Sequence, residues 1–134
     1  CVPRPGLVLE CPERRLTAAS RALFFEEEAG GEWEFVDAAL PSTHTMPHGC
    51  TASPWIGSMN LLSLSPDKVL VEETERATIG LLEDLGLEVV PVAYRDAYRF
   101  GGGLHCQTLD VRRDGDCKSY FPHLQRRHRG EDVE

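Results

Sequence analysis

The strongest constraint on the fold is an ordered run of strand and helix patterns in the second half of the chain. Ile56–Leu64 and Val69–Val71 flank a Ser-Pro-Asp-Lys turn, which predicts two strands joined as a β-hairpin. Thr74 then precedes apolar residues at helical spacing, and Gly86 follows them, so a capped helix is expected. Leu87–Val92 reads as the next strand. This order predicts a mixed α/β (α+β) fold containing a ββαβ unit.

The first half of the chain shows a weaker version of the same alternation. Gly6–Leu9 reads as a buried strand, and Arg14–Glu28 has the composition of a helix that ends at a glycine pair. Trp33–Val36 alternates apolar and polar residues, which predicts a further strand. Pro41–Pro54 is rich in proline, serine and histidine and is expected to form an irregular loop. The ββαβ unit is therefore expected to occur twice.

Composition limits the partners and the compartment. The chain of 134 residues suits one domain, and its net charge of −8 argues against nucleic acid or an anionic membrane surface as a partner. No apolar run approaches the roughly 20 residues of a membrane-spanning helix. The five cysteines are odd in number and irregularly spaced, which favours free thiols and a cytoplasmic location over a disulfide scaffold. The chain begins with Cys1 instead of methionine, and we interpret it as a piece of a longer protein.

A glycine run followed by a cysteine is the main candidate for chemistry. Gly101–Gly103 allows close backbone approach, and His105–Val111 is expected to form a last strand with Cys106 at its start. A thiol held on a rigid element with one side open can serve as a nucleophile. The alternative is a buried core cysteine beneath a glycine turn, because free cysteine is among the most buried residue types.

Neighbouring polar residues have simpler interpretations. His105 is expected to face away from Cys106, because successive strand residues point to opposite faces, so a structural role is favoured. Asp110 is expected to pair with Arg112 or a nearby backbone group. A zinc site can be drawn from the residues His44, His48 and Cys50 with Cys106 or Cys117, but the spacing matches no established zinc motif.

Four stretches of the chain resemble one known family. Gly101–Arg113, which reads Gly-Gly-Gly-Leu-His-Cys-Gln-Thr-Leu-Asp-Val-Arg-Arg, resembles the C-terminal signature of the arginine amidinotransferases. These include the glycine and inosamine-phosphate amidinotransferases. Pro5–Arg14 (Pro-Gly-Leu-Val-Leu-Glu-Cys-Pro-Glu-Arg), Trp55–Asn60 (Trp-Ile-Gly-Ser-Met-Asn) and Leu85–Val92 (Leu-Gly-Leu-Glu-Val-Val-Pro-Val) resemble the same family in the same order. The resemblance extends to about Tyr120.

The resemblance implies a fold and a place in a longer chain. The family fold is a five-bladed α/β propeller (a pentein) of ββαβ modules, and residues 1–120 would be its C-terminal part of about two modules. Residues 121–134 would form a charged tail that frays. A catalytic His-x-Asp element is expected just ahead of Cys1, and further carboxylates that bind the guanidinium group are expected upstream of it.

The resemblance also implies a reaction and its residues. Cys106 would attack the guanidinium carbon of L-arginine, release ornithine and carry the amidino group until an acceptor amine takes it. Arg14 would bind a substrate carboxylate, and Ser53 would contact the substrate. No metal or organic cofactor is expected. The partners would be the two small-molecule substrates, with a homodimer as an allowed assembly.

Two other functions stay open at this point. A hydrolase of the arginine deiminase or dimethylarginine hydrolase type would use the same cysteine and give the amidino intermediate to water. An inactive fragment that lacks the upstream His and Asp is the other alternative. The identity of the acceptor amine is not predicted by these residues.

Overall fold

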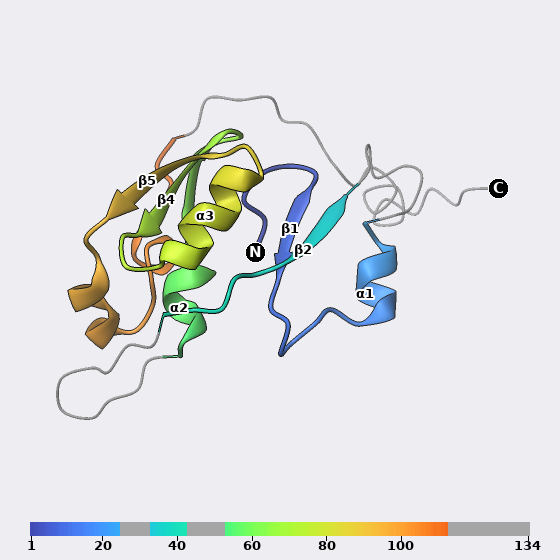
Figure 1. Cartoon of the computed structure of the whole chain (residues 1–134), viewed down its shortest axis with the longest axis horizontal. Coiled ribbons are helices and arrows are strands. Elements are labelled where there is room, and N and C mark those ends of the chain that lie inside the picture. The colour runs from blue at the N-terminus through green and yellow to red at the C-terminus, as the bar shows by residue number, and fades with distance from the viewer. Residues whose placement is uncertain (25–32, 43–52, 113–134) are drawn as a thin grey trace.

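The computed structural model describes residues 1–24, 33–42 and 53–112, and Figure 1 shows their arrangement. The elements, in chain order, are β1 (Leu7–Glu10), α1 (Ala18–Ala22), β2 (Glu34–Asp37), α2 (Trp55–Ser58), β3 (Leu62–Ser65), β4 (Lys68–Glu72), α3 (Arg76–Asp84), β5 (Glu88–Val92) and the short 3₁₀ helices η3 (Arg95–Phe100) and η4 (His105–Gln107). No described helix is long and apolar enough to cross a membrane.

The predicted ββαβ unit is confirmed in β3, β4, α3 and β5. β3 and β4 pair antiparallel as a hairpin with an irregularity between Ser63 and Ser65, and β5 pairs parallel with β4. The strand order is β3-β4-β5, and α3 crosses one face of this sheet (Figure 1). Pro91 lies within β5, which is an edge strand of the sheet among the described residues, where a missing backbone donor is tolerated.

Burial explains why this unit forms. Val69 and Val71 of the central strand are fully buried, and α3 covers the sheet with the buried residues Ile79 and Leu82. Gly86 ends the helix with a φ of 79°, a conformation that glycine adopts without steric cost, as the sequence predicts.

The predicted cap of α3 is wrong by one residue. The helix begins at Arg76, so its N-cap is Glu75, which makes no side-chain capping bond. The hydroxyl of Thr74 donates instead to the carboxylate of Glu72, and the Thr74 backbone N–H donates to Glu72 Oε2 at 2.8 Å. The Thr74 hydroxyl and N–H are therefore both bonded to the Glu72 carboxylate, and Thr74 does not cap the helix.

The first half contains a parallel strand pair crossed by a short helix. β1 and β2 pair from Leu7 opposite Glu34 to Glu10 opposite Asp37, and both predicted strands are confirmed within a residue. The predicted helix Arg14–Glu28 is wrong at its start, because α1 begins only at Ala18, with Thr17 as its N-cap. The expected positions 25–28 lie outside the described residues. In the described part, this half shows a βαβ order and not a second ββαβ unit.

One apolar core joins the two sheets. It combines residues of β1, β4 and α3 with others next to them, namely Leu7, Leu9, Ala38, Leu61, Val69, Val71, Ile79, Leu82 and Leu87. Polar contacts also cross the junction. Ser63 Oγ donates to the Pro3 carbonyl at 2.7 Å, and Arg4 Nη2 donates to the Leu85 carbonyl at 3.1 Å. The two halves therefore form a single packed body.

Two predicted strands are corrected by the structure. The expected strand Ile56–Leu64 starts with α2, and only Leu62–Ser65 is extended. The expected strand His105–Val111 is absent from the described residues 105–111, where η4 is followed by irregular backbone. At η4 the backbone N–H groups of His105 and Cys106 donate to Asn60 (3.4 and 3.2 Å) and not to a neighbouring strand. These two backbone N–H groups are therefore not available to pair with a strand.

Candidate functional site

The thiol of Cys106 is held by one side chain, Asn60. Cys106 lies in η4 as an exposed free cysteine, so the interpretation as a buried core residue is wrong. The Cys106 backbone N–H donates to Asn60 Oδ1 at 3.2 Å, and Asn60 Nδ2 donates to Cys106 Sγ at 2.7 Å. Asn60 lies between the end of α2 and β3, so the segment that leads into the ββαβ unit positions the thiol.

The glycine run packs tightly against the cysteine and its partner. Gly102 has a φ of 103°, and a Cβ there would lie 2.6 Å from Cys106 Cβ. A Cβ on Gly103 would lie 2.6 Å from the Ile56 carbonyl oxygen and 2.7 Å from Asn60 Cβ. Any larger residue would displace the cysteine or the asparagine. The close approach that the glycines predict is therefore confirmed.

His105 and Asp110 lie on a groove beside the thiol. Both are exposed, and they line a hollow of about 610 Å³ together with Cys1, Met59 and Asn60. The prediction that His105 faces away from Cys106 depended on strand alternation, and this argument fails because the segment is a 3₁₀ turn. The pairing of Asp110 with Arg112 stays a prediction.

The segments of Arg14 and Ser53 are brought together. Arg14 is exposed on the turn after β1, where its backbone N–H donates to the Cys11 carbonyl at 3.0 Å. Ser53 is exposed just before α2, and its carbonyl accepts the Ile56 N–H. Trp55 Nε1 donates to Glu13 Oε2 at 3.2 Å, and Glu13 is the residue before Arg14. The segment 53–60 therefore contacts the Arg14 turn at one end and Cys106 at the other.

Helix α2 packs on a cluster of buried polar side chains. Glu75 Oε2 accepts the Ser42 N–H at 2.9 Å, and a Cβ on Gly57 would lie 2.5 Å from Glu75 Oε1 and 2.7 Å from the Tyr98 hydroxyl oxygen. Burial raises the pKa of Tyr98, and the carboxylates of Glu72 and Glu75 raise it further, so the phenol keeps its proton. The helix that precedes Asn60 thus rests on buried side chains of α3 and η3.

The zinc hypothesis involves residues that are mostly not described. His44, His48, Cys50 and Cys117 lie outside the described ranges. Within residues 1–24, 33–42 and 53–112, no three His, Cys, Asp or Glu side chains come together as a metal ion would require.

Asn60 is the functional candidate that residue-level reasoning missed. It closes the Trp-Ile-Gly-Ser-Met-Asn stretch, which carries part of the family resemblance, but the spacing of 46 residues to Cys106 gives no sign of contact. A polar asparagine in the middle of the predicted strand Ile56–Leu64 was the available signal.

Comparison with known proteins agrees with the resemblance. No protein-family model matches the chain. The mitochondrial glycine amidinotransferase of Danio rerio is 38% identical over 120 residues, covering 87% of this chain and 26% of that protein. Inosamine-phosphate amidinotransferase 1 of Streptomyces glaucescens is 38% identical over 117 residues, covering 87% and 32%. The chain thus spans about a quarter to a third of the length of these relatives.

Solved structures extend the likeness to the fold. An amidinotransferase of the saxitoxin biosynthetic pathway from Microseira wollei aligns with a TM-score of 0.72 and 30% identity, over 90% of this chain and 32% of that one. The inosamine-phosphate amidinotransferase of Streptomyces griseus aligns with a TM-score of 0.65 and 34% identity, over 90% and 33%. The chain therefore has a mixed α/β fold of the kind found in a group of transferases. Over most of its length it is homologous to part of the amidinotransferases.

Proposed function

We propose that this chain carries the nucleophile of an amidinotransferase that moves the amidino group of L-arginine to an acceptor amine. The observation that carries the proposal is the Cys106 thiol, which is exposed, packed against Gly102 and given an N–H donor by Asn60. A thiol on a fixed turn with one open side is suited to attack a planar cation. The homology to amidinotransferases supports this reaction over other uses of a reactive cysteine.

The proposed reaction has two steps. The Cys106 thiolate attacks the guanidinium carbon, the bond from that carbon to the ornithine nitrogen breaks, and a general acid protonates the departing amine. The same group, now acting as a base, takes a proton from the acceptor amine as that amine attacks the amidino carbon, and the carbon–sulfur bond breaks with its electron pair returning to sulfur. The proposal invokes no metal or organic cofactor.

Arg14 and Ser53 are proposed to bind substrate. The guanidinium group of Arg14 matches the planar geometry of a carboxylate and can bind it with two hydrogen bonds. The bond between Trp55 and Glu13 supports this assignment, because it keeps the Arg14 turn next to the segment that starts at Ser53. The same segment ends at Asn60, whose side chain contacts Cys106.

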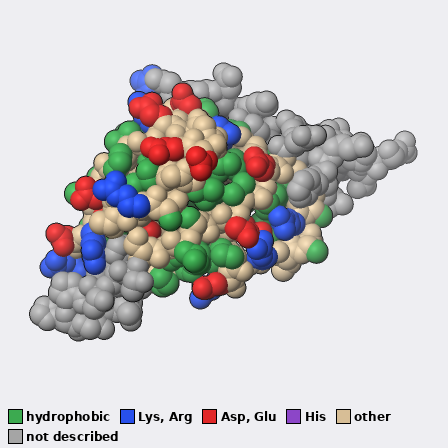
Figure 2. Space-filling view, in the orientation of Figure 1, with side chains coloured by type: hydrophobic (Ala, Val, Ile, Leu, Met, Phe, Trp, Pro, Cys, Tyr) green, Lys and Arg blue, Asp and Glu red, His purple; other side chains and the backbone are tan. Residues whose placement is uncertain are grey.

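We also propose that residues 1–120 are the C-terminal part of a five-bladed propeller of ββαβ modules, in which earlier modules supply the His-x-Asp base and the carboxylates. The partial coverage of the relatives supports this reading. So do the large apolar side chains that are exposed here and would pack on further modules, Leu40, Leu64, Phe100, Leu109 and Val111. Figure 2 shows apolar groups interspersed among charged ones on the visible face. A cytoplasmic location and a homodimer stay predictions.

The test is the covalent intermediate in the complete natural protein. Incubation with arginine and no acceptor amine should leave an amidino group on Cys106, as intact mass and peptide mapping would show. Cys106→Ser should abolish both the adduct and ornithine release, because a hydroxyl supplies almost no anion at neutral pH. Cys11→Ser is the matched control and should keep most activity, since Cys11 lies in the turn after β1.

Two results would contradict this function. An adduct on another cysteine, or full activity in the Cys106→Ser variant, would show that the nucleophile is misassigned. Citrulline formed from arginine without any added amine would instead identify a guanidino-group hydrolase.

A further inference from the structure

We propose that Asn60 is a positioning residue for Cys106, whose side-chain amide fixes the sulfur and donates a hydrogen bond to it during amidino transfer. The inference rests on the proposed function, because it assigns a role within the same site. It concerns a residue outside the set Cys106, Arg14 and Ser53.

The orientation of the Asn60 amide follows from hydrogen-bond chemistry. The Cys106 backbone N–H can only donate, so the Asn60 atom 3.2 Å from it must be the carbonyl oxygen, Oδ1. The other arm of the amide is then the NH₂ group, and it lies 2.7 Å from Cys106 Sγ. Both arms therefore contact the same cysteine, and turning the amide over would break both bonds.

The position of Asn60 is fixed from several sides. Its main-chain oxygen accepts the His105 N–H at 3.4 Å, and its Cβ lies so close to Gly103 that no larger residue fits there. The preceding residue, Met59, donates its N–H to the Trp55 carbonyl at the end of α2. An amide with little freedom to move is a preorganised donor, because no hydrogen bond has to form as the reaction proceeds.

The donor matters most when the sulfur is negative. A hydrogen bond to an anion is stronger than one to a neutral group. During the first step the charge leaves the sulfur as the carbon–sulfur bond forms. When the acceptor amine displaces the cysteine, the electron pair of that bond returns to Sγ, and the Asn60 N–H stabilises the departing thiolate. Asn60 should therefore affect turnover and not arginine binding.

A matched pair of variants in the complete natural protein separates this role from a structural one. Asn60→Asp has nearly the same shape and keeps an oxygen for the Cys106 N–H, but it replaces the NH₂ donor with a second oxygen. Asn60→Ala removes both arms without adding a charge. Thermal melts of each variant show whether it is folded. kcat and KM for arginine are then measured, together with the rate at which iodoacetamide alkylates Cys106, located by peptide mapping.

We expect kcat to fall about tenfold to a hundredfold in the folded Asn60→Ala variant, the loss of one hydrogen bond to a charged group, and further in Asn60→Asp, where the carboxylate also repels the thiolate. KM for arginine should stay near the wild-type value. Alkylation of Cys106 should also slow, because the thiolate that reacts with iodoacetamide is less stable without the N–H donor. If Asn60 only holds the turn, a folded Asn60→Ala variant, which adds no charge, will keep the wild-type kcat and alkylation rate. Wild-type kcat and wild-type alkylation in either folded variant would overturn the inference.

The alkylation measurement distinguishes this inference from the proposed function. It uses no arginine, so slow alkylation in the folded, uncharged Asn60→Ala variant would support the positioning role even in a protein that failed to turn over arginine. Unchanged alkylation in a protein that does transfer amidino groups would overturn the inference and leave the proposed function intact.

Discussion

The described part of the molecule contains two parallel strand pairs, each connected through a helix, and they are stabilised differently. In the pair β4–β5 the crossing helix α3 has nine residues and buries Thr78, Ile79 and Leu82. In the pair β1–β2 the crossing helix α1 has five residues and none of them is buried. Because isolated short helices are marginal in water, the length of each helix follows the apolar surface it can bury.

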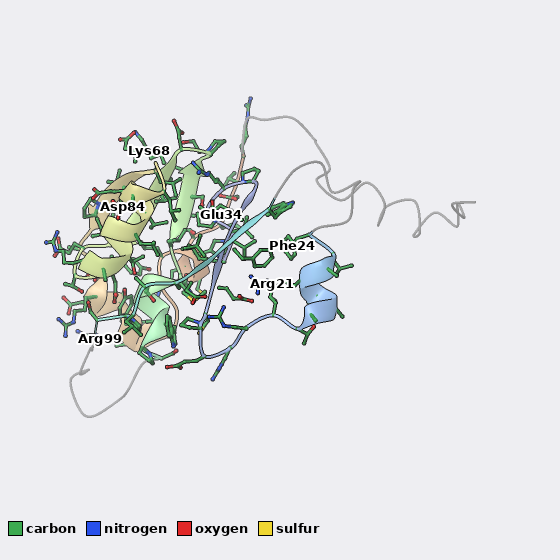
Figure 3. All side chains as sticks on the ribbon, turned by 45° about the vertical axis from the view of Figure 1, so that its right-hand side comes forward. Arg21, Phe24, Glu34, Lys68, Asp84 and Arg99 are labelled. Atoms are coloured by element: carbon green, nitrogen blue, oxygen red, sulfur yellow. The ribbon has the colours of Figure 1, made fainter. Side chains whose placement is uncertain are left out.

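Helix α1 is held to the strands by polar and aromatic contacts instead of by buried apolar side chains. The Arg21 guanidinium lies 4.3 Å from the centre of the Phe35 ring, and Phe24 packs edge-on against Trp33 and Phe35. Figure 3 shows Arg21 and Phe24 on the side of α1 that faces the strands. The buried carboxylate of Glu10 accepts the Leu16 N–H at 2.7 Å. A helix held this way depends on a few specific contacts.

The difference matters for the candidate site. Cys106 is held by Asn60, which leads directly into the sheet that α3 covers. Arg14 lies on the turn that leads to the weakly packed α1. The proposed nucleophile thus lies on the better packed part of the molecule, and the proposed carboxylate-binding residue on the part with less apolar burial.

A leucine-to-alanine substitution should lower the free energy of unfolding by very different amounts in the two helices. Leu82→Ala in α3 should lower the free energy of unfolding by about 2–5 kcal/mol, because Leu82 is fully buried. Leu23→Ala at the end of α1 should cost about 1 kcal/mol or less, because Leu23 is 37% exposed. Urea unfolding of the complete protein measures both. Equal losses would show that the two halves do not differ in packing.

A methyl group at Gly57 should produce an intermediate effect. Its Cβ would meet Glu75 Oε1 at 2.5 Å and the Tyr98 hydroxyl at 2.7 Å, so Gly57→Ala should cost about 1–3 kcal/mol and lower kcat by displacing α2. The matched control is Gly80→Ala in α3, where a Cβ meets nothing within 4 Å. The control should raise stability by about 0.5–1 kcal/mol, since alanine is the better helix former. A Gly57→Ala protein as stable as wild type would show that α2 is loosely seated.

Loss of the Glu10 charge should give the smallest effect. Glu10→Gln keeps an acceptor for the Leu16 N–H but loses the ion pairs to Arg15 (3.3 Å) and Arg21 (3.7 Å). The free energy of unfolding should fall by about 1 kcal/mol, the contribution of a typical hydrogen bond. Glu34→Gln, at an exposed position of β2, should change stability by less than about 0.5 kcal/mol. No difference between the two variants would mean that Glu10 does not stabilise the α1 unit.

Local patterns predicted elements wherever burial and local preference agree. β1, β2, β4, β5 and the glycine end of α3 follow directly from apolar runs and Gly86. The patterns failed at Thr74, where the Glu72 carboxylate competes for the hydroxyl, and at His105–Val111, where Asn60 takes the backbone donors. The Asn60 contact is tertiary, whereas Glu72 is only two residues from Thr74, and the periodicity of apolar residues represents neither contact.

The candidate site also has one part that the sequence predicts and another that only the tertiary structure decides. The glycine run next to the cysteine predicts a tight turn from the sequence alone, because glycine permits the positive φ and the close approach at Gly102. That Asn60 reaches Cys106 and that Trp55 reaches the residue beside Arg14 was decided by the packing of α2 on Glu75 and Tyr98. Side chains dozens of residues apart meet only once the core has fixed the backbone between them, and no local preference contains that distance.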